Sequence, residues 1–122
     1  GVVIGAGAVV TRDITEPGVV AAVTPFDTHH LLWSSPKLVY LDSLAIDGDG
    51  NVCVATISPT GGITVISPTG EVVRYVESGD VLTTNICFGG VDMQDAWITA
   101  SGTGKLYKAK WPRPGLKLNY NA

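Results

Sequence analysis

The chain has 122 residues, a formal net charge of −3, 45% hydrophobic residues and 16% charged residues. This length suits one domain with a sizeable core, and the composition excludes intrinsic disorder, because burial of so much apolar surface can offset the entropy lost on folding. The net charge is small and the sequence has no cluster of basic residues that would bind the phosphates of nucleic acid. No run of 18 apolar residues marks a membrane span. We therefore expect neither nucleic acid nor a membrane as a partner.

The N-terminal residues and the two cysteines bear on the cellular compartment. Residues 1–10 are apolar but lack the basic region of a signal peptide, and Cys53 and Cys87 form no CxxC pair. Each cysteine lies in an apolar, strand-like run, which predicts two buried, reduced thiols. A cytoplasmic location fits this pattern. Because the chain does not begin with Met, we expect a processed or truncated product.

Residues 1–37 are predicted to form a separate N-terminal β segment. Val, Ile and Thr are abundant along the whole chain, and no stretch of 12 residues has the apolar spacing of a helix, so we expect an all-β protein. The stretch Val2–Ala8 imitates a dinucleotide-binding fingerprint. However, its third glycine would stand at Val10 and no amphipathic helix follows, which argues against nucleotide binding.

Residues 38–78 carry short strands separated by turns, with strands predicted over 41–46, 52–57, 63–66 and 71–76. Asp47-Gly-Asp-Gly-Asn51 is predicted as a hairpin turn, since Asp and Gly tolerate positive φ. It also imitates the start of a Ca²⁺ loop, but Val52 stands where that loop needs Gly and Ser58 where it needs Glu. The tetrapeptide Ser-Pro-Thr-Gly occurs twice and marks two further turns.

Residues 79–122 repeat this pattern, with strands predicted over 81–88, 96–100, 105–110 and 116–120, the last after a break at two prolines. Asp42 of the first set aligns with Asn85 of the second at an offset of 43 residues. Four strands in about 40–45 residues are typical of a β-propeller blade. We therefore predict two four-stranded antiparallel β-propeller-like blades, over 38–78 and 79–122.

Two blades do not close a ring, because closed propellers have at least about four. The chain is thus expected to be a fragment of a propeller that associates with copies of itself, and three copies would supply six blades. A homo-oligomer, with a trimer as the simplest closed form, is the predicted assembly.

The chain from about residue 38 onward resembles the senescence marker protein/gluconolactonase/luciferin-regenerating enzyme family. The resemblance begins at Leu41-Asp-Ser-Leu-Ala-Ile-Asp-Gly-Asp-Gly-Asn-Val-Cys-Val-Ala-Thr56 and continues through Gly61-Gly-Ile-Thr-Val-Ile-Ser-Pro68 and Thr84-Asn-Ile-Cys-Phe-Gly-Gly90. It ends with Ser101-Gly-Thr-Gly-Lys105 and Trp111-Pro-Arg-Pro-Gly115. These motifs occur in the family's order and cover about residues 38–122.

The resemblance implies a six-bladed propeller that hydrolyses sugar lactones with a divalent metal (Ca, Zn or Mn) on its axis. The family holds this metal with a Glu, an Asn and an Asp from different blades, and Asp42 occupies the Asp position. Asp42 is therefore the expected metal ligand and catalytic residue, and Asn85 is expected to face the same funnel and bind substrate.

Each of these residues also has a structural interpretation. Asp42 would bond backbone amides at a strand start, and Asn85 would be a buried Asn that satisfies backbone groups. The chain has no segment matching the family's Glu and Asn ligands, and one carboxylate cannot hold a divalent cation alone. The fragment is therefore expected to be incomplete as an active site, or to bind no metal.

The first 21 residues resemble the end rung of a hexapeptide-repeat acyltransferase, with Ile4 and Val10 at the six-residue aliphatic spacing. Three functional hypotheses follow. The chain is a remnant of a gluconolactonase-like lactone hydrolase, or a non-catalytic, recombined or truncated β-domain that self-associates, or a trimeric acyltransferase-like module that binds an acyl-CoA.

Overall fold

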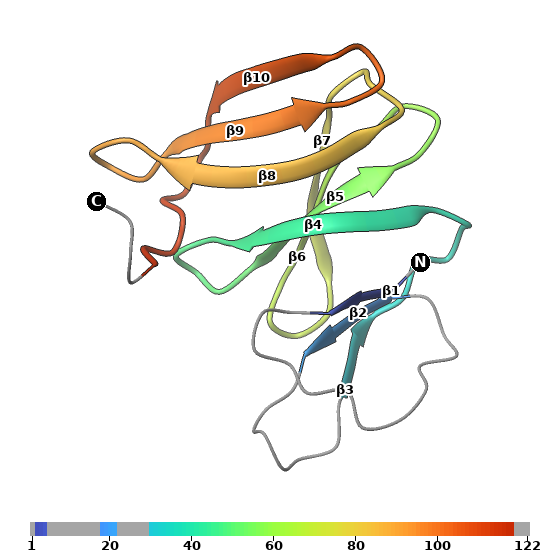
Figure 1. The fold of residues 1–122 in the computed structure, drawn as a ribbon. Coiled ribbons are helices and arrows are strands. Elements are labelled where there is room, and N and C mark those ends of the chain that lie inside the picture. Colours follow the sequence, from blue (N-terminus) through green and yellow to red (C-terminus); the bar gives the residue numbers. More distant parts are fainter. Residues whose placement is uncertain (1, 5–17, 22–29, 119–122) are drawn as a thin grey trace.

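The computed structural model describes residues 2–4, 18–21 and 30–118, whose strands form three sheets (Figure 1). The described part contains no helix, so none in it is long and apolar enough to span a membrane, and the all-β prediction is confirmed. In the N-terminal sheet, β1 (Val2–Ile4) pairs in parallel with β2 (Gly18–Ala21), and β3 (His30–Trp33) runs antiparallel to β2. The predicted domain boundary after residue 37 falls between β3 and β4 and stays a prediction.

The first predicted blade is a four-stranded antiparallel meander. The strands β4 (Tyr40–Ile46), β5 (Val52–Ile57), β6 (Gly62–Ile66) and β7 (Val72–Glu77) pair in sequence order. Two of its turns end at Gly61 (φ 62°) and Gly70 (φ 87°), a backbone conformation that residues with a Cβ rarely adopt. The predicted strands of this blade are confirmed to within one residue at each end.

The second sheet has three strands in the described part of the chain, in the order β10-β9-β8. They are β8 (Thr83–Gly89), β9 (Asp95–Ala100) and β10 (Lys105–Lys110). The strand predicted over 116–120 is not formed at Leu116–Leu118, and residues 119–120 lie outside the described residues. The second blade is therefore propeller-like but lacks the fourth strand expected there.

Residues 111–118, here called the C-terminal strap, cross back to the first sheet instead of adding to β10. Pro112 and Pro114 have no N–H to donate to a strand ladder, which removes the hydrogen bonds that a fourth strand needs. The strap is bonded to both blade hairpins, since the Trp111 amide donates to the Gln94 carbonyl (2.7 Å) and the Gly48 amide donates to the Pro114 carbonyl (2.7 Å). A Cβ at Gly115 would overlap the Phe88 side chain, so close packing requires glycine there.

Backbone pairing shows which residues of the two sheets are equivalent. In the first sheet Ile46 pairs with Val52, and in the second Phe88 pairs with Ala96. When these two pairs are matched, they enclose residues 47–51 in the hairpin from β4 to β5 and residues 89–95 in the hairpin from β8 to β9. The second hairpin is therefore two residues longer. As a result, no single offset aligns the two blades.

This register corrects the predicted match between Asp42 and Asn85. Leu41 on β4 and Thr83 on β8 hold equivalent positions, because each makes the last pair before a bulge in its strand. The residue equivalent to Asp42 is therefore Thr84, and Asn85 corresponds to the residue after Asp42. The offset on this strand is one residue smaller than the sequence comparison indicated.

The core lies between the two blade sheets. Its buried side chains are Cys53, Ala55, Ile63 and Val65 from the first sheet, Ile86, Ala96 and Ile98 from the second, and Trp111 from the strap. A second cluster covers the other face of the first sheet, where Val52, Val54 and Ile66 pack with Leu32 and Trp33 around β3. Burial of both faces explains why β5 and β6 are apolar almost throughout.

Asp80 fixes the connection between the two sheets. This residue is only 2% exposed, and its carboxylate accepts hydrogen bonds from the Leu82, Gly102 and Thr103 amides (2.9, 3.1 and 2.7 Å) and from the Thr103 hydroxyl (2.6 Å). The Thr103 hydroxyl, helped by these amides, lowers the pKa of Asp80 below its ordinary value of 3.8. The carboxylate thus ties the link after β7 to the turn between β9 and β10.

We predict that Asp80→Asn lowers the thermal midpoint at pH 7, because the amide NH₂ cannot accept the bonds that the lost oxygen accepted. A lowered folded-state pKa means that the stabilisation is present above pH 3.8 and is lost as pH falls through the folded value. The variant should therefore lose less stability than the wild type between pH 5 and pH 2, as measured by urea unfolding. Asp49→Asn, at an exposed turn position, is the control; an equal effect there would contradict this role for Asp80.

Candidate functional site

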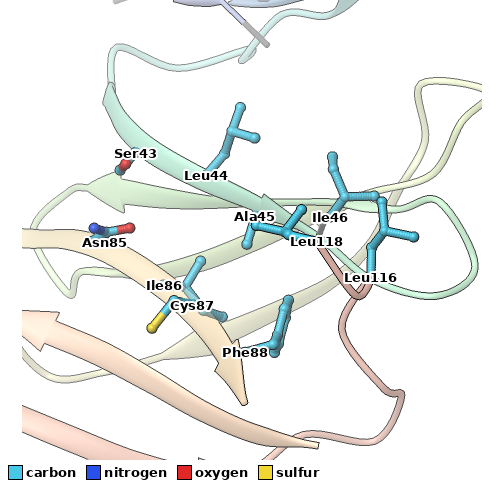
Figure 2. Close-up of a pocket in the computed structure, with 10 residues that line it drawn as sticks. All are labelled: Ser43, Leu44, Ala45, Ile46, Asn85, Ile86, Cys87, Phe88, Leu116 and Leu118. Atoms are coloured by element: carbon cyan, nitrogen blue, oxygen red, sulfur yellow. The ribbon is translucent and has the colours of Figure 1, made fainter. Parts of the chain in front are cut away.

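The innermost strands of the two blades, β4 and β8, lie side by side (Figure 1). A groove of about 410 Å³ lies between them, and Figure 2 shows the residues that line it. The groove is lined by Ser43, Leu44, Ala45, Ile46, Asn85, Ile86, Cys87, Phe88, Leu116 and Leu118. Inner strands are where a propeller faces its axis, so this groove is the candidate site.

Asp42 lies at the bulge of β4 and is exposed, which leaves its carboxylate accessible to solvent. It is not among the residues that line the groove, but its neighbour Ser43 is. The bulge places one extra residue on β4 opposite β5, and such irregularities re-aim side chains at sheet edges. Asp42 therefore lies next to the polar end of the groove. The residues that line the groove include no carboxylate.

Asn85 lies on β8, is exposed and lines the groove. Figure 2 shows Asn85 and Ser43 at one end of the groove, and Phe88, Leu116 and Leu118 toward the other. The structure thus brings Asn85 and Ser43 to a common polar end. The interpretation of Asn85 as a buried residue is wrong, because its side chain is open to solvent.

The two cysteines differ in environment, so the prediction that both are buried is wrong for Cys87. Cys53 is fully buried, and that burial, with a smaller effect of Asp47, raises the pKa of its thiol to about 12. Cys87 is exposed at the groove. Both are free thiols.

The turn that imitates a Ca²⁺ loop is a hairpin, as predicted. Asp47 is fully buried, and its carboxylate accepts hydrogen bonds from the Asn51 backbone amide (3.0 Å), the Asn51 side-chain amide (2.9 Å) and the Asp49 amide (3.0 Å). These bonds direct the carboxylate into the turn, where it replaces the backbone partners that the turn lacks.

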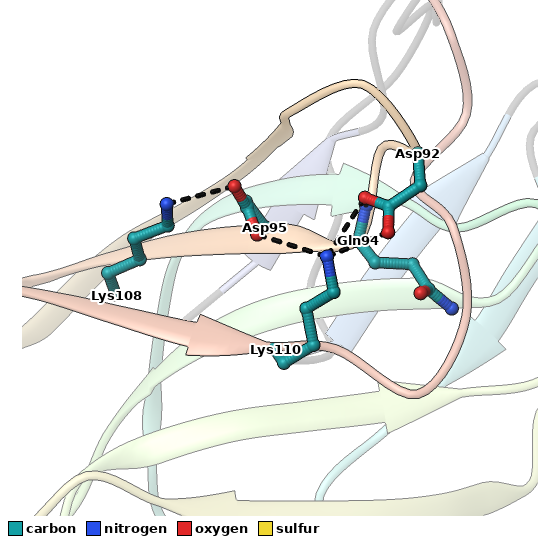
Figure 3. Close-up of polar contacts among 5 residues, drawn as sticks. All are labelled: Asp92, Gln94, Asp95, Lys108 and Lys110. Atoms are coloured by element: carbon teal, nitrogen blue, oxygen red, sulfur yellow. Dashed lines mark hydrogen bonds and ion pairs between the residues drawn. The ribbon is translucent and has the colours of Figure 1, made fainter.

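The sequence analysis missed a cluster of charged residues on β9, on β10 and in the hairpin between β8 and β9 (Figure 3). Lys108 pairs with Asp95 (2.9 Å), and Lys110 pairs with both Asp92 (2.7 Å) and Asp95 (3.3 Å). The lysine hydrogen bonds lower the pKa of Asp92 and Asp95, and Asp92 in turn raises the pKa of Lys110. Groups shifted in these directions stay charged and paired near neutral pH, so they are poor candidates for proton transfer.

No group of three or more His, Cys, Asp or Glu side chains able to hold a metal occurs among residues 2–4, 18–21 and 30–118. On the strands β4 and β8, Asp42 is the one carboxylate residue. Neutral oxygens near it, from Ser43 and Asn85, would be weak additional donors.

Comparison with known proteins places the site in a family context. The family model of the SMP-30/gluconolactonase/LRE-like region matches residues 8–102, which is well over half of the chain. The match starts at residue 8 rather than near 38, and so includes most of the stretch that resembled a hexapeptide-repeat acyltransferase. That resemblance finds no support, and its residues 5–17 lie outside the described residues. No curated protein matches the chain.

The difference between the thiols predicts that one cysteine per folded chain reacts with a thiol reagent at pH 8. Cys87→Ser should abolish fast labelling, while Cys53→Ser should retain it, because Cys53 is buried and its pKa is raised to about 12. In denaturant both thiols of the wild type should react. Fast labelling of Cys53 in the folded protein, detected by mass spectrometry, would contradict the packing of the core.

Proposed function

The chain belongs to the SMP-30/gluconolactonase/LRE-like family, and we propose that it forms two blades of a propeller that hydrolyses sugar lactones. The observation that carries this proposal is the position of Asp42 and Asn85 on the innermost strands of adjacent sheets. Both side chains are exposed, and Asn85 lines a groove with Ser43. A polar end on an otherwise apolar groove is the common form of a small-molecule site.

The proposed reaction is the addition of water to the lactone carbonyl carbon, followed by cleavage of the ring C–O bond to give a hydroxy acid. In this proposal the Asp42 carboxylate accepts a hydrogen bond from the attacking water and takes its proton, which later passes to the ring oxygen as it leaves. The Asn85 side-chain amide donates a hydrogen bond to an oxygen of the substrate and so orients the ring.

A divalent cation such as Ca²⁺, Zn²⁺ or Mn²⁺, which the family resemblance implies, does not fit the described residues by themselves. Hard cations take several oxygen ligands, whereas the inner strands present one carboxylate. Further ligands would have to come from other blades. We therefore assign Asp42 as one metal ligand in a completed ring and derive no step through the metal.

Completion of the ring by copies of the chain is part of the same proposal. Three copies would provide six blades and bring three Asp42 carboxylates toward one axis. Three acidic groups from identical copies are a different ligand set from the Glu, Asn and Asp of the family. The cytoplasmic location stays a prediction.

A non-catalytic, self-associating β-domain is the second candidate, and one specific observation favours it. Val72, Val73 and Tyr75 on the outer strand β7 are between 42% and 48% exposed, although they are apolar or aromatic. An exposed edge strand with such side chains readily pairs with another chain. In this case association would not create a catalytic centre.

We predict that the chain hydrolyses D-glucono-δ-lactone in the presence of Mn²⁺, Zn²⁺ or Ca²⁺, and that Asp42→Asn lowers the rate by about 100-fold or more, because a proton acceptor is removed. Asp49→Asn is the matched control, since Asp49 is an exposed carboxylate of the hairpin turn. Light scattering would give the assembly of each variant.

Two results would overturn the proposal. A monomer that binds no metal and shows only background hydrolysis would leave the non-catalytic domain as the better description. Equal activity of the wild type and Asp42→Asn would remove Asp42 from the reaction.

A further inference from the structure

The groove between β4 and β8 has two unlike ends. Ser43 and Asn85 supply the polar side chains at one end, and the remaining lining is apolar apart from the Cys87 thiol. Its floor and walls come from residues of both sheets and of the strap, as Figure 2 shows. The lining therefore changes from polar to apolar along the length of the groove.

The C-terminal strap lines the apolar end of the groove. The Leu116 amide donates to the Ile46 carbonyl (2.9 Å), and the Gly115 amide donates to the Met93 carbonyl (2.7 Å), so the strap is fixed to both hairpins at that end. Leu116 and Leu118 then line the groove together with Ile46 and Phe88. A molecule that enters from the polar end would meet this apolar wall.

We propose that this groove selects lactones that carry an apolar chain, with the ring at Ser43 and Asn85 and the chain along the apolar lining. The lactone ring in this assignment rests on the proposed function, and the apolar chain rests on the groove itself. The volume of about 410 Å³ lies within the range of roughly 300–1,000 Å³ that is usual for small-molecule sites.

A polyhydroxylated ring is a poorer match for the same lining. Each hydroxyl that enters the apolar part loses water without gaining a side-chain partner, and an unpaired buried polar group is unfavourable. An alkyl chain has no such penalty and gains from burial against leucine, isoleucine and phenylalanine side chains. The groove thus discriminates by the desolvation of hydroxyl groups.

The experiment compares δ-decalactone with D-glucono-δ-lactone, which has the same number of non-hydrogen atoms. Amide NMR shifts of the 122-residue protein are followed in EDTA at mildly acidic pH with freshly dissolved lactone, so that binding is read without metal and before the lactone ring opens in water. We expect δ-decalactone to shift the amides of residues 44–46 and 86–88 and to bind at least about tenfold more tightly than the sugar lactone.

Matched leucine variants locate the binding. Leu118→Ser should weaken δ-decalactone binding severalfold, whereas Leu106→Ser on β10 should leave it unchanged, because Leu106 is similarly exposed (59% against 61%) but lies outside the groove. Unchanged far-UV circular dichroism and thermal midpoints would show that both variants are folded. Asp49→Asn, at an exposed turn carboxylate outside the groove, should bind δ-decalactone like the wild type. Because the titration reads binding and not turnover, a failure of the hydrolytic proposal is distinguishable from a failure of this one.

Three outcomes would overturn the inference. Tighter binding of the sugar lactone would show that the groove prefers hydroxyl groups. Equal weakening by Leu106→Ser would show unspecific adsorption to exposed leucines. An absence of shifts at residues 44–46 and 86–88 would place the ligand elsewhere.

Discussion

The structure depends on the need of the first blade sheet to bury both of its faces. Nearly all residues of β5 and β6 are apolar or buried, so each face of this sheet needs a cover. The second sheet covers one face through Ile86, Ala96 and Ile98, and β3 covers part of the other through Leu32 and Trp33. A sheet with two apolar faces cannot be stable in water by itself, and stacking of neighbours is the physical basis of propeller and repeat architectures.

This packing positions the candidate site. Because the second sheet lies against the first, the innermost strands β4 and β8 are brought side by side, and the groove forms where they meet. The strap contributes to the same result, since Trp111 is buried in the core and its ring lies 5.8 Å from that of Phe88. The groove is therefore a consequence of core packing, and its polar end is formed by residues that the core does not need.

Local signals predicted most of the fold. The strands of the first blade and its turns follow from alternating or continuous apolar runs between Asp-Gly and Ser-Pro-Thr-Gly sequences, which act over a few residues. The strand expected over 116–120 failed for a long-range reason, because the strap bonds to the two hairpins instead of to β10. The exposure of Cys87 could not be predicted from its apolar sequence neighbours either. It depends on how β8 lies next to β4, which leaves Cys87 in the groove between the two strands.

The site was predicted only in part. Asp42 and Asn85 are both exposed on innermost strands, as their positions in the repeat suggested. Their supposed equivalence failed because a sequence offset does not reveal a change in hairpin length. The ion pairs of Asp92 and Asp95 with Lys108 and Lys110 join residues of different strands, and only the register of β9 against β10 brings them together.

The longer hairpin of the second sheet has a consequence for how such blades can change. An added pair of residues leaves every later side chain on its original face, so that Ala96 and Ile98 still point at the core. A single added residue would turn these two side chains toward solvent and would turn their neighbours Asp95, Trp97 and Thr99 inward. Insertions and deletions at this hairpin should therefore be tolerated in even steps, which makes it a natural point at which related blades diverge in length without losing their core.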